Sequence, residues 1–183
     1  MIQTKNKTIL ISRLAMLIAL TLVIQMVGLP QPITGPLINA MLLITVSLLG
    51  WISGTILGLM TPVVALLRGQ LPAPLAPMVP FIAIGNIVLV SAYYLISRKR
   101  ATEKTKSPWR QTYLHAGVIA AAIVKFAWLT FAAHLVLPIV LAHSLPPPLL
   151  YAMTLPQLVT GLLGGALNIL FLEVLNRAGY DYK

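Results

Sequence analysis

Charged residues are scarce in this sequence, and acidic residues are scarcer still. Only 9% of the 183 residues are charged, and Asp and Glu together number three. A soluble domain usually carries about a quarter charged residues, so these few charges cannot form a water-exposed surface. The mean hydropathy of +0.92 favours an integral membrane protein instead. We therefore expect a single transmembrane domain over residues 1–183, almost all of it within the lipid bilayer.

The sequence also lacks the residue sets that carry most catalytic chemistry. Cysteine is absent, which excludes disulfides, thiolate metal sites and cysteine nucleophiles. There is no Walker A loop, no acid pair, no metal-ligand spacing and no Ser-His-Asp set with a buried acid. We expect no catalytic residue, no metal and no cofactor, and therefore no enzyme. If such a chain is a carrier, it lacks coupling acids and an ATPase motif, so its energy would have to come from another protein.

What is present is positive charge, gathered in three places. The net charge is +10, and eleven of the thirteen Lys and Arg residues lie in the N-terminal tail, in one internal stretch or in the C-terminal tail: Lys5, Lys7, Arg13; Arg98, Lys99, Arg100, Lys104, Lys106, Arg110; Arg177, Lys183. Apolar segments separate these clusters. Basic loops are typical of the cytoplasmic face of a membrane protein, so we expect no nucleic-acid binding.

The apolar segments predict six transmembrane helices, because about 20 apolar residues cross the hydrocarbon. The expected spans are residues 10–29, 37–50, 52–68, 79–97, 113–137 and 149–174. The second and third are short and almost contiguous, so this boundary is open between two tilted spans and one bent hairpin. An even number of crossings places all three basic clusters on one side. The prediction is an all-α six-helix bundle of the bacterial inner membrane, with both termini cytoplasmic.

The expected outer connections are rich in proline rather than in charge. They are LPQPITGP (29–36), RGQLPAPLAPMVP (68–80) and LAHSLPPPLL (141–150). Proline lacks an N–H and has a fixed φ, so such segments can lie rigidly across a bundle with few unpaired donors. Two interpretations have equal support: a lid over the bundle, or prolines that merely begin and end helices.

Small residues recur at four-residue spacing in two of the expected spans. Ala15 and Ala19 form AMLIA in the first span, and GWISGTILG carries glycines at 50, 54 and 58. This spacing places small residues on one helix face, where another helix can approach closely. The glycine row is the better candidate for packing inside the chain.

Polar residues within the spans gather toward the expected outer side. Those in the outer part are Gln25, Asn39, Asn86, His134, Thr154 and Gln157, whereas the inner part holds Asn168 and a few Ser and Thr. Buried polar residues are costly in a membrane, so this asymmetry predicts a hydrated or ligand-filled cavity that opens outward.

Lys125 lies near the middle of the fifth span, too deep to reach the interface easily. The three acids, Glu103, Glu173 and Asp181, lie in a loop, a helix end and a tail, so none is an obvious partner. Two interpretations remain open: a structural lysine that meets backbone or amide oxygens or loses its proton, or a lysine whose partner is an anionic or carbonyl-rich substrate. Trp128 follows one turn later and could offer a stacking surface. A cavity without acids argues against a cationic substrate.

Four stretches between residues 13 and 86 resemble substrate-binding S components of energy-coupling factor (ECF) vitamin transporters. They are RLAMLIAL, TGPLINAMLL, GLMTPVVALLRG and APMVPFIAIGN. The general plan of that family covers the whole chain. The resemblance implies high-affinity binding of a neutral or anionic vitamin or precursor, for example riboflavin, folate, pantothenate, biotin or cobalamin. It also implies two kinds of partner: a membrane coupling subunit (the T component) and two cytoplasmic ATPases.

The resemblance further implies roles for particular residues. Ala15 and Ala19 would pack on the coupling subunit. The pocket would lie under the first and third outer loops and be formed largely by the last three helices. Its candidate residues are Asn39, Asn86, Lys125, Trp128 and Gln157. The alternative is a standalone small permease or channel subunit, which would form a homo-oligomer through the glycine row.

Overall fold

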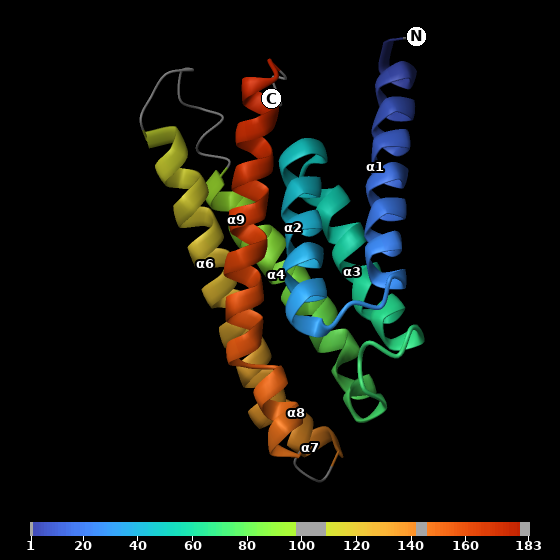
Figure 1. The fold of residues 1–183 in the computed structure, drawn as a ribbon, viewed down its shortest axis with the longest axis vertical. Helices are drawn as coiled ribbons and strands as arrows, with labels where there is room; N and C mark the ends of the chain where they lie inside the picture. Colours follow the sequence, from blue (N-terminus) through green and yellow to red (C-terminus); the bar gives the residue numbers. More distant parts are fainter. Residues whose placement is uncertain (1, 98–108, 142–145, 180–183) are drawn as a thin grey trace.

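The computed structural model describes residues 2–97, 109–141 and 146–179, and all regular structure in these residues is helical (Figure 1). The elements are α1 (Ile2–Met26), α2 (Gln31–Leu49), α3 (Trp51–Leu67), η1 (Ala73–Met78), α4 (Val79–Ser97), α6 (Trp109–Phe131), η2 (Ala132–Val136), α7 (Leu137–Leu141), α8 (Pro147–Ala152) and α9 (Leu155–Arg177). Most of the basic segment 98–110, the middle of the proline-rich segment 141–150, and the acids Glu103 and Asp181 lie outside the described residues.

Five helical segments are long and apolar enough to cross a membrane, and α3, with 17 residues, is a shorter apolar helix. The chain is therefore a multi-pass, all-α membrane protein. The helix bounds differ from the expected spans most clearly in three places. α1 begins at Ile2, within the basic tail, and α2 begins at Gln31, six residues before the expected start and within the expected connection 29–36. The expected span 149–174 is broken between α8 and α9.

Prolines explain the irregular segments of the last two spans. Pro156 has no N–H to donate to the carbonyl of Ala152, so the chain turns between α8 and α9. Pro138 likewise cannot bond to the carbonyl of His134, and the preceding turn widens into the π-helix η2. The long helix that continues from α6 therefore changes its winding without ending.

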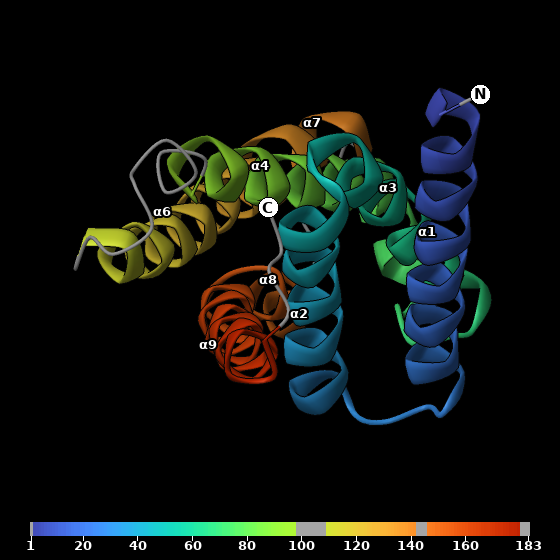
Figure 2. The same ribbon diagram turned by 90° about the horizontal axis from the view of Figure 1, so that it is seen from above.

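The helices run alternately up and down in one bundle. The start of α1, the end of α4, the start of α6 and the end of α9 lie at one end of the bundle (Figure 1). The connections at 27–30 and 68–78, together with α7 and α8, lie at the other end, which we call the proline-rich end. Seen along the bundle, α1 lies at the edge and packs on α2 and α3, while α2 packs closely on α9 (Figure 2).

Gly50 resolves the boundary between the second and third spans. Its φ of 88° is readily available only to glycine, and its N–H bonds to the carbonyl of Val46 at 2.9 Å. The chain reverses here, so α2 and α3 form a helical hairpin. Gly54 and Gly58 then face inward: a Cβ on Gly54 would overlap Val46 Cγ2, and one on Gly58 would lie 3.1 Å from Asn86 Cβ.

Two buried apolar clusters fill the bundle at different levels. The cluster nearer the termini includes Leu42, Leu57, Leu89 and Ala121. A buried polar group lies beside it: the Asn168 amide donates to the Tyr93 hydroxyl at 2.8 Å, and Ser47 Oγ lies 2.9 Å from the same hydroxyl. These hydrogen bonds join α2, α4 and α9 at that level.

The second cluster lies at the proline-rich end and includes part of the loop 68–80. Leu75 and Met78 of η1 are completely buried against Leu129 and Leu137 of the long helix that begins as α6. The prolines also begin helices, since Pro30, Pro72 and Pro146 stand immediately before the first residues of α2, η1 and α8, and each of these helices has a further proline at its first or second position. In this loop both interpretations of the prolines hold: they start helices, and the segment packs rigidly over the bundle.

Candidate functional site

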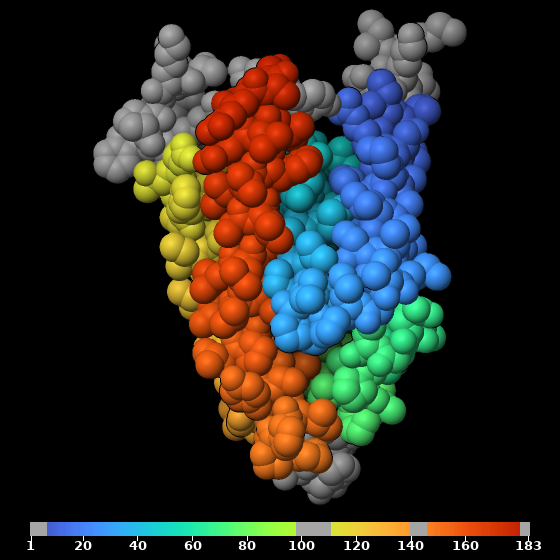
Figure 3. All heavy atoms as spheres, viewed as in Figure 1, coloured from blue at the N-terminus to red at the C-terminus, as the bar shows by residue number. Residues whose placement is uncertain are grey.

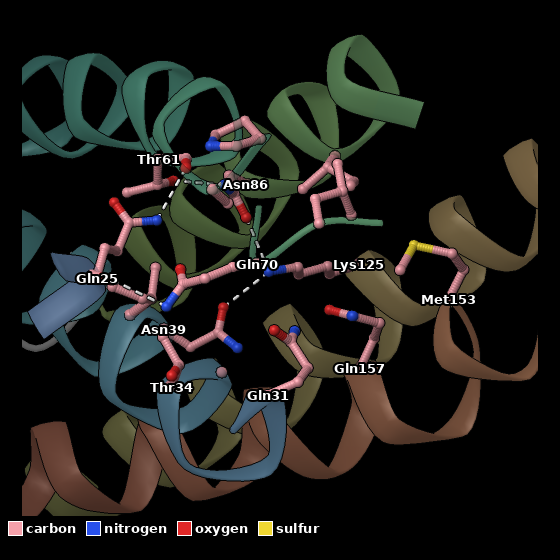
Figure 4. A pocket seen from close by; sticks show the side chains of 16 residues that line it. Gln25, Gln31, Thr34, Asn39, Thr61, Gln70, Asn86, Lys125, Met153 and Gln157 are labelled. Atoms are coloured by element: carbon pink, nitrogen blue, oxygen red, sulfur yellow. Dashed lines mark hydrogen bonds between the residues drawn. The ribbon is translucent and has the colours of Figure 1, made fainter. Parts of the chain in front are cut away.

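A cavity lies between the two apolar clusters and draws side chains from every long helix of the bundle (Figure 4). The residues that line it are Gln25, Gln31, Thr34, Gly35, Ile38, Asn39, Thr61, Pro62, Ala65, Gln70, Leu71, Ile82, Asn86, Lys125, Met153 and Gln157. Gln31 alone among them is exposed, so the cavity opens beside it at the proline-rich end. Most of the lining comes from the first three helices and the loop after them, and not from the last three helices as the resemblance implied.

Among the described residues that line the cavity, Lys125 alone is charged. It is only 3% exposed, and its ammonium donates to Asn39 Oδ1 at 2.7 Å and to Asn86 Oδ1 at 2.8 Å (Figure 4). An ammonium has three N–H groups, so one remains beyond these two bonds. Amide oxygens from α2 and α4 thus hold the charge of α6 at the cavity wall.

Asn86 is oriented by a proline on the neighbouring helix. Pro62 cannot donate to the carbonyl of Gly58, four residues earlier in α3, so that carbonyl is free for another donor. The Asn86 side-chain amide takes this position at 3.0 Å and also donates to Thr61 Oγ1 at 3.1 Å. With its N–H groups engaged, Asn86 turns its oxygen toward Lys125.

Asn39 is positioned by close approach of α2 and α9. A Cβ on Gly164 would lie 2.6 Å from Asn39 Cβ and 2.8 Å from the carbonyl oxygen of Pro36, so only glycine permits this contact. The Asn39 amide nitrogen lies 3.4 Å from Thr160 Oγ1 on the same helix, α9. Helix α9 therefore fixes the second amide that holds Lys125.

Four glutamines complete the polar lining. Gln25 donates to the carbonyl of Thr61 at 2.9 Å, while its buried Oε1 has no partner within the described part of the chain. Gln70 donates to the backbone carbonyl of Gln25 at 3.0 Å. Gln157 donates to the Ala152 carbonyl, at 3.2 Å, which Pro156 leaves free. The side-chain amides of Gln31 and Gln157 point toward each other beside Lys125 (Figure 4).

Four of the five predicted binding residues meet at this cavity: Asn39, Asn86, Lys125 and Gln157. Trp128 does not line it. Its indole nitrogen donates to the carbonyl of Phe81 at 2.9 Å, and its ring lies beside Gly85 on α4. A residue three positions after Lys125 is rotated about 60° around the helix, which is enough to turn the indole toward α4.

The other polar residues of the outer group divide in the same way. Gln25 lines the cavity, whereas His134 is exposed and bonds to the carbonyl of its own helix at Thr130. Thr154 bonds to the Tyr151 carbonyl in the turn before α9. The sequence reasoning missed Gln31, Gln70, Thr34 and Thr61 as lining residues. The available signal was their position within or beside the proline-rich segments and the TP pair of α3.

Ala15 and Ala19 lie together on the exposed face of α1. The opposite face buries Leu17, Thr21 and Gln25 against the bundle. α1 forms the edge of the molecule, on the side away from α6 (Figure 3). The two alanines are therefore free for contact with another helix, and they are remote from the cavity wall formed by α4, α6 and α9.

The cavity offers binding groups rather than reactive ones. Glu173 is the acid within the described residues, and it bonds to Gln111 near the end of α9, away from the cavity. The described residues contain no group of three or more His, Asp or Glu side chains that could hold a metal ion. One ammonium, two asparagines and four glutamines can together recognise oxygen and nitrogen atoms of a small molecule.

Comparison with known proteins agrees with a binding role. A family model described as "ECF transporter, substrate-specific component" matches residues 10–175. No curated protein and no solved structure matches the chain. The matched range contains both alanines of α1 and every residue that lines the cavity. The family that this model describes is a transport subunit and not an enzyme.

Proposed function

Because the chain belongs to the substrate-specific components of ECF transporters, we propose that it binds a vitamin or vitamin precursor, neutral or anionic, and presents it for import. The observation that carries this proposal is the cavity around Lys125, which combines a buried ammonium, several amides and an apolar wall. The described residues of its lining include no acid, so a cationic substrate would find no counter-charge among them. Asn39, Asn86, Lys125 and Gln157 are the proposed binding residues.

The proposed topology has six membrane crossings with both termini in the cytoplasm of a bacterial cell. α3 is the sixth crossing in addition to the five longer spans. The start of α1 and the end of α9 lie at the same end of the bundle, which supports an even number of crossings (Figure 1). The basic residues of both tails and of the segment 98–110 favour the cytoplasmic side for that end. The proline-rich end, with the cavity mouth beside Gln31, then faces outward.

The proposed partners are a membrane T component and two cytoplasmic ATPases. The sequence contains no nucleotide-binding motif of its own, so uptake against a gradient needs an external source of energy. The exposed pair Ala15 and Ala19 provides a small-residue face on which a helix of the T component can pack closely. The lipid bilayer surrounds the remaining apolar surface.

The alternative of a self-associating permease loses its main support. It requires the glycine row of α3 as an oligomerisation surface, but Gly54 and Gly58 are buried against α2 and α4 within one chain. Gly50 serves the turn before α3. No other observation in the described residues favours that alternative.

Copurification tests the proposal directly. The tagged chain, purified from its native membrane, should bring down one membrane coupling protein and two ATPases. Ala15→Trp should abolish this association, because an indole prevents close helix packing, and should leave substrate binding unchanged. Met26→Trp is the matched control: Met26 lies on the same exposed side of α1, two turns beyond Ala19 toward the proline-rich end. Uptake that persists in cells without any coupling module would contradict the proposal.

A further inference from the structure

We infer that the cavity selects a non-aromatic carboxylate that also carries hydroxyl or N–H donors. This inference rests on the proposed function, since it names the chemical class of the substrate for the same cavity. Three properties of the lining lead to it: an ammonium without a carboxylate partner, a wall without aromatic rings, and amide oxygens without donors.

The first property is the uncompensated charge of Lys125. Its two observed partners, Asn39 Oδ1 and Asn86 Oδ1, are neutral. Glu173, the acid within the described residues, bonds to Gln111 near the other end of the bundle. A buried charge is costly unless it is paired, and neutral amides supply only part of what an opposite charge supplies. A ligand carboxylate at the third N–H of Lys125 provides the missing counter-charge.

The second property concerns the apolar part of the wall. It consists of aliphatic and thioether side chains, namely Ile38, Pro62, Ala65, Leu71, Ile82 and Met153. Flat heteroaromatic ligands are commonly held between aromatic side chains, which offer ring stacking. No Phe, Tyr or Trp is among the described residues that line the cavity, and the nearby Trp128 is bonded to Phe81 instead. This wall suits a branched or saturated ligand body.

The third property is a surplus of amide oxygens. Gln25 Oε1 is buried and accepts no hydrogen bond from the described residues. Gln157 uses its nitrogen for the Ala152 carbonyl, which leaves its oxygen available beside Lys125. Unpaired buried acceptors cost free energy until a donor reaches them. A hydroxyl or N–H group on the ligand satisfies the Gln157 oxygen, whereas a purely accepting ligand does not. Gln25 Oε1 is enclosed by the chain, so the Gln25 side chain must turn before this oxygen can accept a hydrogen bond from the ligand.

Binding of four defined probes to the detergent-purified chain tests this class. Pantothenate and biotin are non-aromatic carboxylates that carry hydroxyl or N–H donors, whereas riboflavin and folate carry flat aromatic ring systems. We expect one of the first two to bind tightest. Its uncharged counterpart, pantothenol or biotin amide, should bind at least about 30-fold more weakly, because a buried charge pair is lost.

Two variants test the role of the ammonium. Asn39→Asp keeps the shape of the side chain and supplies an internal counter-charge 2.7 Å from Lys125, so the acid should lose at least about 30-fold in affinity while its uncharged counterpart changes little. Lys125→Met should produce the same selective loss of affinity for the acid. The two variants are independent, so one still gives a measurement if the other folds poorly. Asn176→Asp is the control, because Asn176 is exposed near the end of α9.

The outcomes separate the inference from the proposed function. The inference is overturned if riboflavin or folate binds tightest, if acid and uncharged counterpart bind equally, or if neither acid binds. It is also overturned if both variants bind the acid as the parent chain does. Copurification of the coupling subunits is measured on the same preparations. If those subunits copurify while the acid probes fail, the substrate class is wrong and the transport role stands.

Discussion

Replacing Gly164 with alanine should disturb both the helix packing and the cavity, because this residue lies where α2 and α9 are closest. The added Cβ would lie 2.6 Å from Asn39 Cβ, 2.8 Å from the Pro36 carbonyl oxygen and 2.9 Å from the Ala40 nitrogen. Two of these three atoms belong to the backbone, so a rotamer change cannot relieve the contact. The two helices must separate, and overpacking of this kind costs about 1–3 kcal/mol.

Gly117→Ala is the matched control for this substitution. Gly117 is also a buried glycine inside a helix, but its Cβ would meet the nearest atom, Tyr93 Cδ2, at an ordinary 3.4 Å. Both variants gain the same helix propensity, about 1 kcal/mol for alanine over glycine. The difference between their free energies of unfolding therefore isolates the overpacking. We expect the Gly164 variant to be less stable than the control by about 1–3 kcal/mol.

The functional effect follows from the movement of Asn39. A hydrogen bond to a charged group is worth about 1.5–3 kcal/mol, and loss of roughly half of the Asn39–Lys125 bond lowers ligand affinity about tenfold. Thermal unfolding in detergent measures the stability difference, and titration with the tightest-binding probe measures the affinity. Equal melting temperatures and equal affinities for the two variants would refute the argument that α9 positions Asn39.

Two further predictions concern other parts of the molecule. Tyr93→Phe removes the hydroxyl shared by Asn168 and Ser47, so it should cost about 1–3 kcal/mol of stability in thermal unfolding. Ligand affinity should stay unchanged, because none of the three residues lines the cavity. A large loss of affinity would contradict this separation of the two levels. The sequence has no cysteine, so single introduced cysteines can show which side of the membrane each connection faces. Ala73→Cys should react with a membrane-impermeant maleimide in intact cells, and Thr105→Cys should react only after permeabilisation. The reverse pattern would contradict the proposed topology.

Composition and the spacing of apolar residues were enough to predict the helical class. A chain with so few charges cannot present a polar surface, and a helix is the structure that satisfies its backbone hydrogen bonds within lipid. The prediction for the last span was less accurate, because its apolar run continues across residues 153 and 154, where Pro156 causes a break between α8 and α9. Hydropathy measures the preference for lipid and does not detect a missing N–H.

The candidate site was predictable only in part. Lys125, Asn39, Asn86 and Gln157 could be selected from sequence because polar groups at membrane depth are costly and therefore informative. The same reasoning selected His134, which the structure places on the exposed surface. Depth along a helix is readable from sequence, but the direction of a side chain around the helix depends on which neighbour the helix meets.

The amino-acid sequence by itself determined the membrane class, the helical structure, the absence of a nucleotide-binding motif and a lysine at membrane depth with no acid in its own span. Tertiary structure alone decided which atoms surround that lysine. Pro62 frees a carbonyl that Asn86 of another helix uses, and Gly164 admits Asn39 because α2 and α9 pack there. These contacts join residues far apart in the chain, and the local patterns of a sequence carry no record of which distant helices become neighbours.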